Sequence, residues 1–303
     1  MKKLCLILIA IAFTISYFIY TTLQTEVDGL LHIYILDIGQ GDATLIVTPD
    51  GKRILIDAGP SSQALEKALD DILPSHSQTL DIISLSHPDK DHAFGIMGKE
   101  NILRPKLTLL SQVLTKTQYK TIIRNLKEIS PIVFADSKKD LQLTPEITLD
   151  TLYPFSSGTG SSYDPTNDGS IIQKLKYKNF SMLFTGDIGK EPLKVLTNIY
   201  GESLKSTVLK MPHHGSKNNW TENFLKSVNA PITTISSGKN NSYNHPSPET
   251  LDQLKELGTT VYDTQELGTI EIKTNGLSLT TCYIKNKSTL CQDELFLENS
   301  QKK

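Results

Sequence analysis

Ser86-His87-Pro88-Asp89-Lys90-Asp91-His92 places two histidines and two aspartates close together, directly after the apolar run 82–85. That run is typical of a buried strand, and metal-ligating side chains after it indicate a metal-binding loop. Imidazole nitrogen and carboxylate oxygen suit zinc, manganese or iron. Because ligands so close in sequence cannot all converge on one ion without strain, the loop favours two ions, which would activate water and clamp an attacked phosphoryl or acyl group. A solvated polar turn is the alternative for this stretch alone.

Three other apolar runs lead to residues that a two-metal site needs. The run 181–184 precedes Asp187, which could bridge two cations, and the run 207–209 precedes the pair His213-His214. The run 54–56 ends at Asp57, which could hold the metal ligands through hydrogen bonds. Asp or Gly after a single strand usually means only a turn. The joint occurrence of these segments, in this order, predicts the site.

The same segments resemble a known family. Asp57-Ala58-Gly59, His87-x-Asp89-x-Asp91-His92, Thr185-Gly186-Asp187 and His213-His214-Gly215-Ser216 are similar, in this order, to the motifs of the metallo-β-lactamase superfamily. The motif 36–43, Leu-Asp-Ile-Gly-Gln-Gly-Asp-Ala, and Asp89 where most members carry a second His, resemble the ComEC-like branch. Phosphorylcholine esterases resemble this branch too. The resemblance covers residues 30–284.

The resemblance implies a role for each motif residue. One ion is expected on His87 and Asp89 and the other on Asp91 and His92, with Asp187 bridging them. His214 is expected to complete the second ion, although the sequence alone does not choose between His213 and His214. The predicted metal ligands are therefore His87, Asp89, Asp91, His92, Asp187 and His214, supported by Asp57 and Asp42. The His that most members carry between the ligand loop and the bridging Asp has no counterpart here, and residues 167–170 stand near that place.

Three residues are predicted to act in catalysis. Asp91 could orient the attacking water, while His213 or His245 could protonate the leaving oxygen. His245 precedes a helix expected from Pro248, where a substrate phosphate would meet free backbone N–H groups; the alternative is a loop His that caps local carbonyls. Lys210 is a weaker candidate for a phosphate contact, as are Ser216 and Asn218.

Length and turn signals predict one α/β domain. The 303-residue chain has a net charge of −2, which gives no global attraction to nucleic acid. Hairpin turns are expected at Asp50-Gly51, Lys178-Asn179 and Asn275-Gly276, with helices over 62–73, 116–128, 191–200, 222–228 and 248–257. Hairpins alternating with helices fit a four-layered αββα sandwich over residues 30–285. Residues 155–169 are expected to form a surface loop, and 286–303 a C-terminal tail.

The N-terminal segment, residues 1–25, predicts export. Two lysines precede residues 4–20, which carry no charge, as in a signal peptide or an uncleaved signal anchor. Cys282 and Cys291 then form an even pair in the exported part, and a disulfide between them is plausible, with two free thiols as the alternative. We therefore expect a secreted protein or one anchored on the outer face of the membrane.

The predicted function is that of an exported hydrolase with two divalent ions, zinc or manganese. By resemblance it is a phosphodiesterase whose first candidate substrate is single-stranded DNA. An esterase that acts on phosphoesters or phosphorylcholine of envelope polymers is the second hypothesis, and a non-catalytic envelope binding protein with a relict site is the third. The sequence does not indicate an oligomeric state.

Overall fold

The computed structural model describes residues 9, 11–14, 16, 28–74, 78–113, 116–155, 166–285, 288–292 and 294–297. Most of the predicted leader lies outside these residues, as does the larger part of the predicted loop 155–169. Within the described part of the chain, none of the helices combines the length and the apolar character that a membrane span requires.

The larger of two sheets is built from the N-terminal half of the domain and the C-terminal strands. It runs in the order β16 (Ser288–Cys291), β15 (Ser278–Lys285), β14 (Thr269–Thr274), β1 (Leu31–Ile35), β2 (Thr44–Val47), β3 (Arg53–Ile56), β4 (Ile82–Leu85), β5 (Leu107–Leu110) and β6 (Ile132–Phe134), with β17 (Leu295–Phe296) also paired to β15. The hairpins predicted at Asp50-Gly51 and Asn275-Gly276 join β2 to β3 and β14 to β15.

The smaller sheet is formed by the central part of the chain. Its order is β13 (Thr260–Asp263), β12 (Ile232–Ile235), β11 (Val208–Lys210), β10 (Phe180–Phe184), β9 (Ile172–Tyr177), β8 (Ile147–Tyr153) and β7 (Leu141–Thr144). The predicted hairpin at Lys178-Asn179 joins β9 to β10, and Lys178 takes the left-handed conformation of a tight turn.

Both sheets are mixed, which the hairpin signals did not predict. Strands β3, β4, β5 and β6 pair in parallel in one sheet, and β10, β11, β12 and β13 do so in the other. Parallel neighbours need a crossover connection, usually a helix. Helices supply these crossover connections, so the carboxyl ends of the parallel strands lie at one edge of each sheet.

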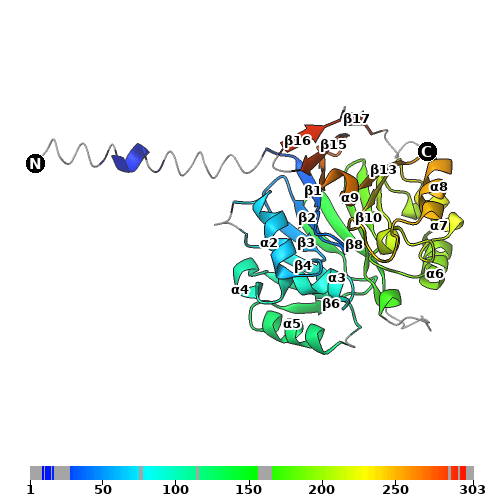
Figure 1. The fold of residues 1–303 in the computed structure, drawn as a ribbon. Helices are drawn as coiled ribbons and strands as arrows, with labels where there is room; N and C mark the ends of the chain where they lie inside the picture. Colours follow the sequence, from blue (N-terminus) through cyan, green and yellow to red (C-terminus); the bar gives the residue numbers. More distant parts are fainter. Residues whose placement is uncertain are drawn as a thin grey trace, which may run out of the picture.

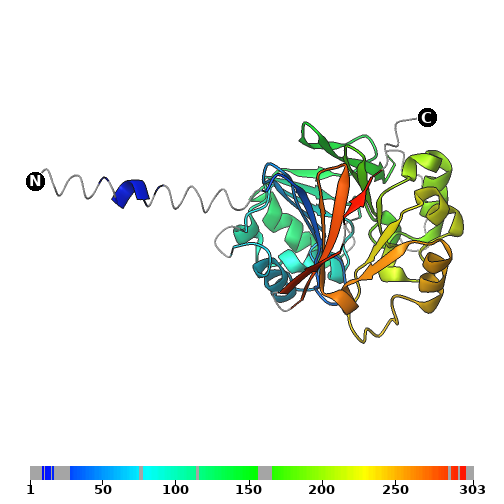
Figure 2. The same cartoon turned by 90° about the horizontal axis from the view of Figure 1, so that it is seen from above.

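Helices cover the outer face of each sheet, as Figures 1 and 2 show. The helices are α2 (Ser62–Asp70), α3 (Lys90–Ala93), α4 (Glu100–Leu103), α5 (Thr117–Lys127), α6 (Lys190–Tyr200), α7 (Glu222–Val228), α8 (Pro248–Glu256) and α9 (Thr264–Leu267). Apolar residues of α2 and α5 pack on the larger sheet, and those of α6, α7 and α8 on the smaller. A third cluster fills the space between the sheets. The predicted α/β class is confirmed, with helices outside and sheets inside.

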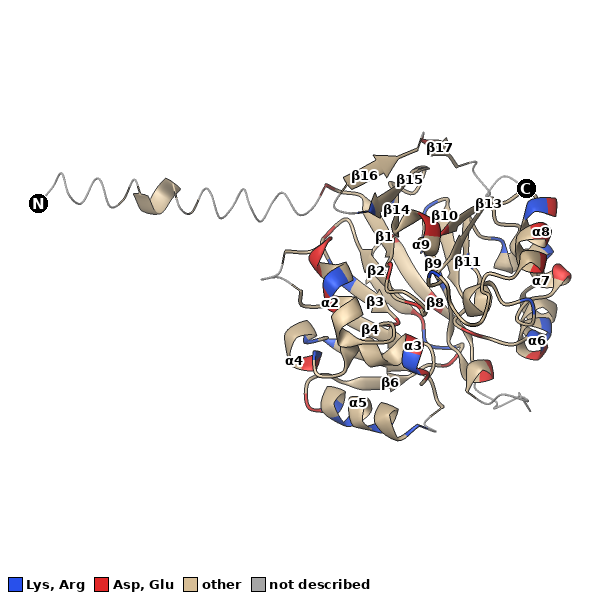
Figure 3. Cartoon of the chain, in the orientation of Figure 1, with Lys and Arg blue, Asp and Glu red and all other residues tan. Residues whose placement is uncertain are grey.

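Charged residues of both signs occur on several of the outer helices, while α5 carries only basic ones (Figure 3). Lys, Arg, Asp and Glu are interspersed over the outer helices α2, α6 and α8 (Figure 3). Attraction of a polyanion would therefore depend on a local site, as the net charge predicts.

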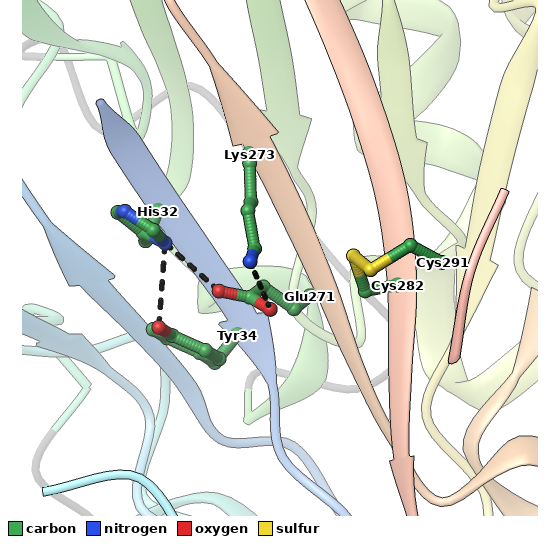
Figure 4. Close-up of a disulfide and its surroundings, with 6 residues drawn as sticks. All are labelled: His32, Tyr34, Glu271, Lys273, Cys282 and Cys291. Carbon is green, nitrogen blue, oxygen red and sulfur yellow. Dashed lines mark hydrogen bonds and ion pairs between the residues drawn. A yellow bond between two sulfur atoms is a disulfide. The ribbon is translucent and has the colours of Figure 1, made fainter. Parts of the chain in front are cut away.

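The predicted disulfide is confirmed. Cys282 on β15 and Cys291 on β16 face each other in the register of the two strands and are bonded, as Figure 4 shows. The segment predicted as a tail thus contributes β16 and β17 to the larger sheet. The bond fastens this edge to the body of the domain.

A polar cluster lies close to the disulfide on β1 and β14. His32 Nδ1 lies 2.8 Å from Glu271 Oε1 and 3.3 Å from the Tyr34 hydroxyl, while Lys273 approaches the other carboxylate oxygen at 3.5 Å (Figure 4). His32 Nε2 lies 2.8 Å from Asp28. Burial by itself would lower the pKa of His32, but hydrogen bonds to the two carboxylates outweigh it and raise that pKa.

Candidate metal centre

Four strand ends bring the predicted ligands together. Asp57 follows β3 and the ligand loop 86–92 follows β4, which are parallel neighbours in the larger sheet. Asp187 and the His213-His214 pair follow β10 and β11, parallel neighbours in the smaller sheet. The Ile171 amide donates to the Ser86 carbonyl at 2.9 Å, which ties the two sheets together at this edge.

Asp57 fixes the ligand loop, as its predicted supporting role requires. Its Oδ1 accepts from the Ser86 amide at 2.7 Å, and its Oδ2 accepts from Ser86 Oγ at 2.7 Å and from His92 Nδ1 at 2.8 Å. Asp57 adopts a positive φ of 55°, a left-handed conformation that Asp tolerates better than most residues. The carboxylate therefore sets the His92 tautomer with Nδ1 protonated and the Nε2 lone pair facing the site.

Imidazoles from the ligand loop and from the His213-His214 segment converge on Asp187. Its carboxylate lies 3.1 Å from His92 Nε2, 3.5 Å from His214 Nε2 and 4.0 Å from His87 Nε2. His214 Nε2 also lies 3.4 Å from the Asp91 carboxylate. Asp187 is thus placed between the imidazoles of both predicted ligand pairs, and its own amide donates to Ser170 Oγ at 3.2 Å.

The buried imidazoles fit a metal site. The Nε2 atoms of His87, His92 and His214 are buried, and none of them forms a well-aligned hydrogen bond among the described residues, although the Asp187 carboxylate lies 3.1–4.0 Å away. Their Nδ1 atoms are occupied, by Ser86 Oγ at 3.0 Å, by Asp57 and by the Ser236 carbonyl at 2.9 Å. A buried polar atom without a partner is costly, and imidazole ligands normally bond through their other nitrogen in this way. The three Nε2 atoms therefore face one carboxylate-lined space whose donor set suits a divalent cation.

Asp42 lies closer to the centre than a purely supporting role requires. Ligand atoms of Asp42, His92, Asp187 and His214 all lie within 4.8 Å of one another. Asp42 Oδ1 lies 3.3 Å from His214 Nδ1, and Oδ2 forms a buried ion pair with Lys210. Burial would raise the pKa of Asp42, but Lys210 and then His214 outweigh it and hold that pKa at about 2.

Lys210 is consequently not available as the phosphate contact suggested by the sequence. Its side chain is buried, and its ammonium faces Asp42 rather than solvent. The ion pair keeps Asp42 anionic beneath the imidazoles. Sequence reasoning missed this pairing because nothing in either motif points to the other.

Asp89 pairs with a residue that is not one of the predicted ligands. Its carboxylate, with a quarter of the side chain exposed, pairs with Lys116 Nζ at 2.6 Å. The backbone of Asp89 also begins α3, which carries Asp91 and His92 into the site. Its assignment to the first ion remains a prediction.

The electrostatics of the centre differ between its histidines. Burial, and then the charge of His92, lower the pKa of His87 to about 4, so its imidazole is neutral and ready to bind a cation. Burial alone would also lower the pKa values of His92 and His214, but Asp187 and the neighbouring carboxylates raise both well above the usual range. Burial would raise the pKa of Asp187, but the charges of His92 and His214 outweigh burial and hold that pKa well below its usual range. Carboxylates and imidazoles here balance one another's charge.

The paired histidines occupy a strained turn. His213 and His214 both have a positive φ, at 47° and 55°, which is uncommon outside glycine. His214 is fully buried and faces Asp91 and Asp187, whereas His213 is 27% exposed with its Nε2 3.6 Å from Asp187. A Cβ on the following Gly215 would clash with Pro246, so the turn packs directly against the next loop.

His245 stands beside this turn in the loop before α8. Its ring centroid lies 5.5 Å from that of His213 and 6.4 Å from that of His214. Burial, and then the charges of His213 and His214, lower the pKa of His245 to about 4. Ser247 caps the N-terminus of α8, since its Oγ accepts from the Thr250 amide at 3.2 Å.

Two further positions support the site without a sequence signal that identified them. Asn219 donates to the carbonyls of Asp187 and Ile188 at 3.1 Å, which holds the bridging segment. Asp168, in the segment that stands near the absent His, accepts from the Gly189 amide at 3.0 Å. Both act on the backbone around Asp187, an effect that depends on contacts between distant segments.

Comparisons with known proteins find similarity to the metallo-beta-lactamase superfamily and to two longer bacterial proteins. The family model described as the metallo-beta-lactamase superfamily matches residues 36–102. ComE operon protein 3 of Bacillus subtilis (strain 168) is 27% identical over 278 residues, which cover 84% of this chain and 34% of that protein. Recombination protein 2 of Haemophilus influenzae is 29% identical over 242 residues, covering 78% of this chain and 28% of that protein. The chain thus spans about a third of the length of these relatives.

A solved structure shares the fold. The Zn(2+)-bound PqqB from Methylobacterium extorquens aligns with a TM-score of 0.50 and 11% sequence identity, over 74% of this chain and 85% of that one. At this identity the likeness concerns the arrangement of strands and helices alone.

Proposed function

We propose that this chain is a metal-dependent hydrolase, similar to the metallo-β-lactamase superfamily and to competence proteins, and that it is a phosphodiesterase acting on DNA. One relative is named Competence protein ComA, of Neisseria gonorrhoeae. Kinship to proteins of competence and recombination supports nucleic acid as the substrate. The buried His/Asp centre supports hydrolysis.

One observation carries the proposal. Three buried imidazoles turn their Nε2 atoms toward a space that the Asp187 and Asp91 carboxylates also face, without a well-aligned hydrogen bond at these nitrogens. Their other ring nitrogens are held by neighbouring oxygen atoms, which is the arrangement that imidazole ligands of a metal ion adopt. Two divalent ions, zinc or manganese, suit such a mixed set of imidazole and carboxylate ligands.

The proposed ligands divide as the motifs predict. His87 and Asp89 would hold one ion, Asp91, His92 and His214 the other, and Asp187 would bridge them. Bound together, two such ions lower the pKa of water and stabilise charge on a phosphoryl group.

The remaining roles belong to side chains around the centre. Asp91 would also orient the attacking water through its second carboxylate oxygen. His213, partly exposed and next to Asp187, would contact the phosphoryl group or protonate the leaving oxygen. The ring centroid of His245 lies 5.5 Å from that of His213, and His245 is the other candidate to protonate the leaving oxygen. Asp57 would keep His92 in the tautomer that binds a cation.

The proposed location is outside the cytoplasm. The apolar segment 4–20 after two lysines supports export, either as a cleaved signal or as a membrane anchor. The disulfide between Cys282 and Cys291 agrees with an oxidising compartment. A tagged chain fractionated from cells, with protease added outside, would test this.

The activity is tested on the full chain purified in detergent. Manganese or zinc is added back after chelation, and hydrolysis of bis-p-nitrophenyl phosphate, labelled single-stranded DNA, p-nitrophenyl phosphorylcholine and nitrocefin is measured in parallel. We expect metal-dependent cleavage of the phosphodiesters, lost in the Asp91→Ala, His92→Ala double variant. Asp252→Ala, on the exposed face of α8, is the matched control and should keep full activity. Absence of metal binding and of phosphodiester cleavage would refute the proposal.

A further inference from the structure

An exposed aromatic side chain stands at the edge of the metal centre. Tyr243 is 66% exposed, unlike most aromatic residues in the described chain, which are buried or half-buried. Its ring stacks on that of His245 with a centroid separation of 5.8 Å and an interplanar angle of 26°. One face of the phenol ring is therefore covered by an imidazole, and the other is left to solvent.

A series of rings leads from the predicted ligands to Tyr243. His213 Nε2 lies 3.6 Å from the Asp187 carboxylate, and the His213 ring meets that of His245 edge to face at 5.5 Å. The stacked Tyr243 comes next, so the two separations place its ring no more than about 11 Å from that of His213. A group attached to a phosphate bound beside His213 would reach the exposed face of Tyr243.

The loop that carries Tyr243 is held in shape by Asn241. The amide nitrogen of Asn241 donates to the Gly238 carbonyl at 2.9 Å and to the His245 carbonyl at 2.6 Å. Its amide oxygen accepts from the backbone of Tyr243 at 3.2 Å and of His245 at 3.0 Å. Four bonds from one side chain preorganise the loop, which reduces the entropy lost when a ligand binds.

The loop is also fastened to the first motif. The Gly238 amide donates to the Gln40 side chain at 3.2 Å, and a Cβ on Gly238 would clash with the backbone of Gln40. Lys239, exposed at the start of the loop, has no ion-pair partner among the described residues and adds a cation for a polyanion. The loop that carries Tyr243 is thus fixed relative to the segment that carries Asp42.

We propose that Tyr243 is the stacking platform for the nucleobase next to the scissile phosphate, an inference that rests on the proposed phosphodiesterase function. A single flat face backed by a second ring suits an aromatic base, and such stacking is tolerant of sequence. A quaternary ammonium group is instead recognised by several aromatic faces arranged as a cage. Among the described residues, the rings that meet this Tyr243–His245 pair are the imidazoles of His213 and His214, so the geometry favours a base over a choline group.

The test compares Tyr243→Ala and Tyr243→Phe with the unmodified full chain. The probes are labelled oligothymidylate and an oligomer of the same length made of abasic sites. Fluorescence anisotropy in EDTA gives Kd, and assays with manganese give kcat and KM. We expect Tyr243→Ala to raise Kd and KM for oligothymidylate about 10-fold or more, with little change in kcat. Tyr243→Phe should behave as the unmodified protein, and abasic oligomers should not distinguish the variants.

A control variant removes a similar ring elsewhere. Phe296→Ala deletes an aromatic side chain that is 76% exposed on β17, where Phe296 pairs with Ser278 at the end of the sheet away from Asp57. It should leave both Kd and KM unchanged. Because Tyr243 is mostly exposed, its truncation should not unfold the protein, which thermal denaturation would verify.

The outcomes separate this inference from the proposed function. Tyr243-dependent binding of oligothymidylate without cleavage under any metal would sustain stacking of a base on Tyr243, but it would refute the phosphodiesterase and with it the place of that base beside a scissile phosphate. Cleavage that is indifferent to Tyr243→Ala, or an equal loss on abasic oligomers, would overturn the platform and leave the activity standing. No binding of oligothymidylate, or a loss confined to p-nitrophenyl phosphorylcholine, would also overturn the platform.

Discussion

Replacing Asp57 by Asn tests whether the tautomer of His92 is set by its carboxylate neighbour. The variant keeps size and shape, and Asn tolerates the left-handed backbone found at this position. Alanine would add backbone strain, so Asn isolates the hydrogen bonds and the charge. Asp57 Oδ1 faces the Ser86 amide, and Oδ2 faces Ser86 Oγ and His92 Nδ1.

Neither orientation of the new amide satisfies these partners. If the NH₂ group takes the place of Oδ2, His92 must offer Nδ1 as an acceptor and move its proton to Nε2, which can then no longer bind a cation. If the NH₂ group instead takes the place of Oδ1, it faces the Ser86 amide, and both groups are donors. Loss of such a supporting carboxylate typically weakens metal binding about 10–100-fold, equivalent to about 1.4–2.7 kcal/mol.

Competition with a chromophoric chelator measures the metal affinity of Asp57→Asn. The control is Asp81→Asn, because Asp81 also accepts a backbone hydrogen bond, from Arg53 at 2.9 Å, at the opposite end of the same pair of strands. We expect weaker binding only in Asp57→Asn, with its circular dichroism spectrum unchanged. Equal metal affinity in the two variants would refute the reasoning.

Four other outcomes are expected. Chelation of the metal should abolish hydrolysis and lower Tm, and added manganese or zinc should restore both. Lys210→Met should lower the free energy of unfolding of the metal-free protein by about 3–5 kcal/mol in urea denaturation, because it leaves Asp42 buried without its cation; an additional Asp42→Asn that recovers nothing would contradict this. Replacing both Cys282 and Cys291 by Ser should lower the free energy of unfolding by about 2–3 kcal/mol. The kcat should not change, since the disulfide lies on the edge strands of the larger sheet and not at the metal centre. The raised pKa of His32 contributes stability that is complete below about pH 6.5 and lost as pH rises through its folded value; unfolding measured against pH should show this slope, and His32→Gln should remove it.

Local patterns predicted the parts of the site that depend on nearby residues. The loop 86–92 after a strand, Asp57 after its neighbour and the pair His213-His214 were all identified, because ligand chemistry and strand ends are visible in a few consecutive residues. Hairpin turns such as Asn275-Gly276 were identified for the same reason, since the turn conformation restricts the residues that it accepts.

Packing between distant segments decided the rest. The parallel pairing of β3 with β4 and of β10 with β11 places four strand ends together, and no local pattern reports which strands become neighbours.

The loop Ser86 to His92, taken together with Asp187 and the pair His213-His214, was enough to predict a metal centre, because ligand-type side chains after apolar runs are visible in the sequence. Only the tertiary structure decided that Lys210 neutralises Asp42 inside the protein and that Asp89 faces Lys116. It also decided that His214 is buried while His213 reaches solvent, and that Tyr243 stands over His245. Burial and charge pairing belong to the assembled fold, because each depends on groups that the chain brings together from far apart.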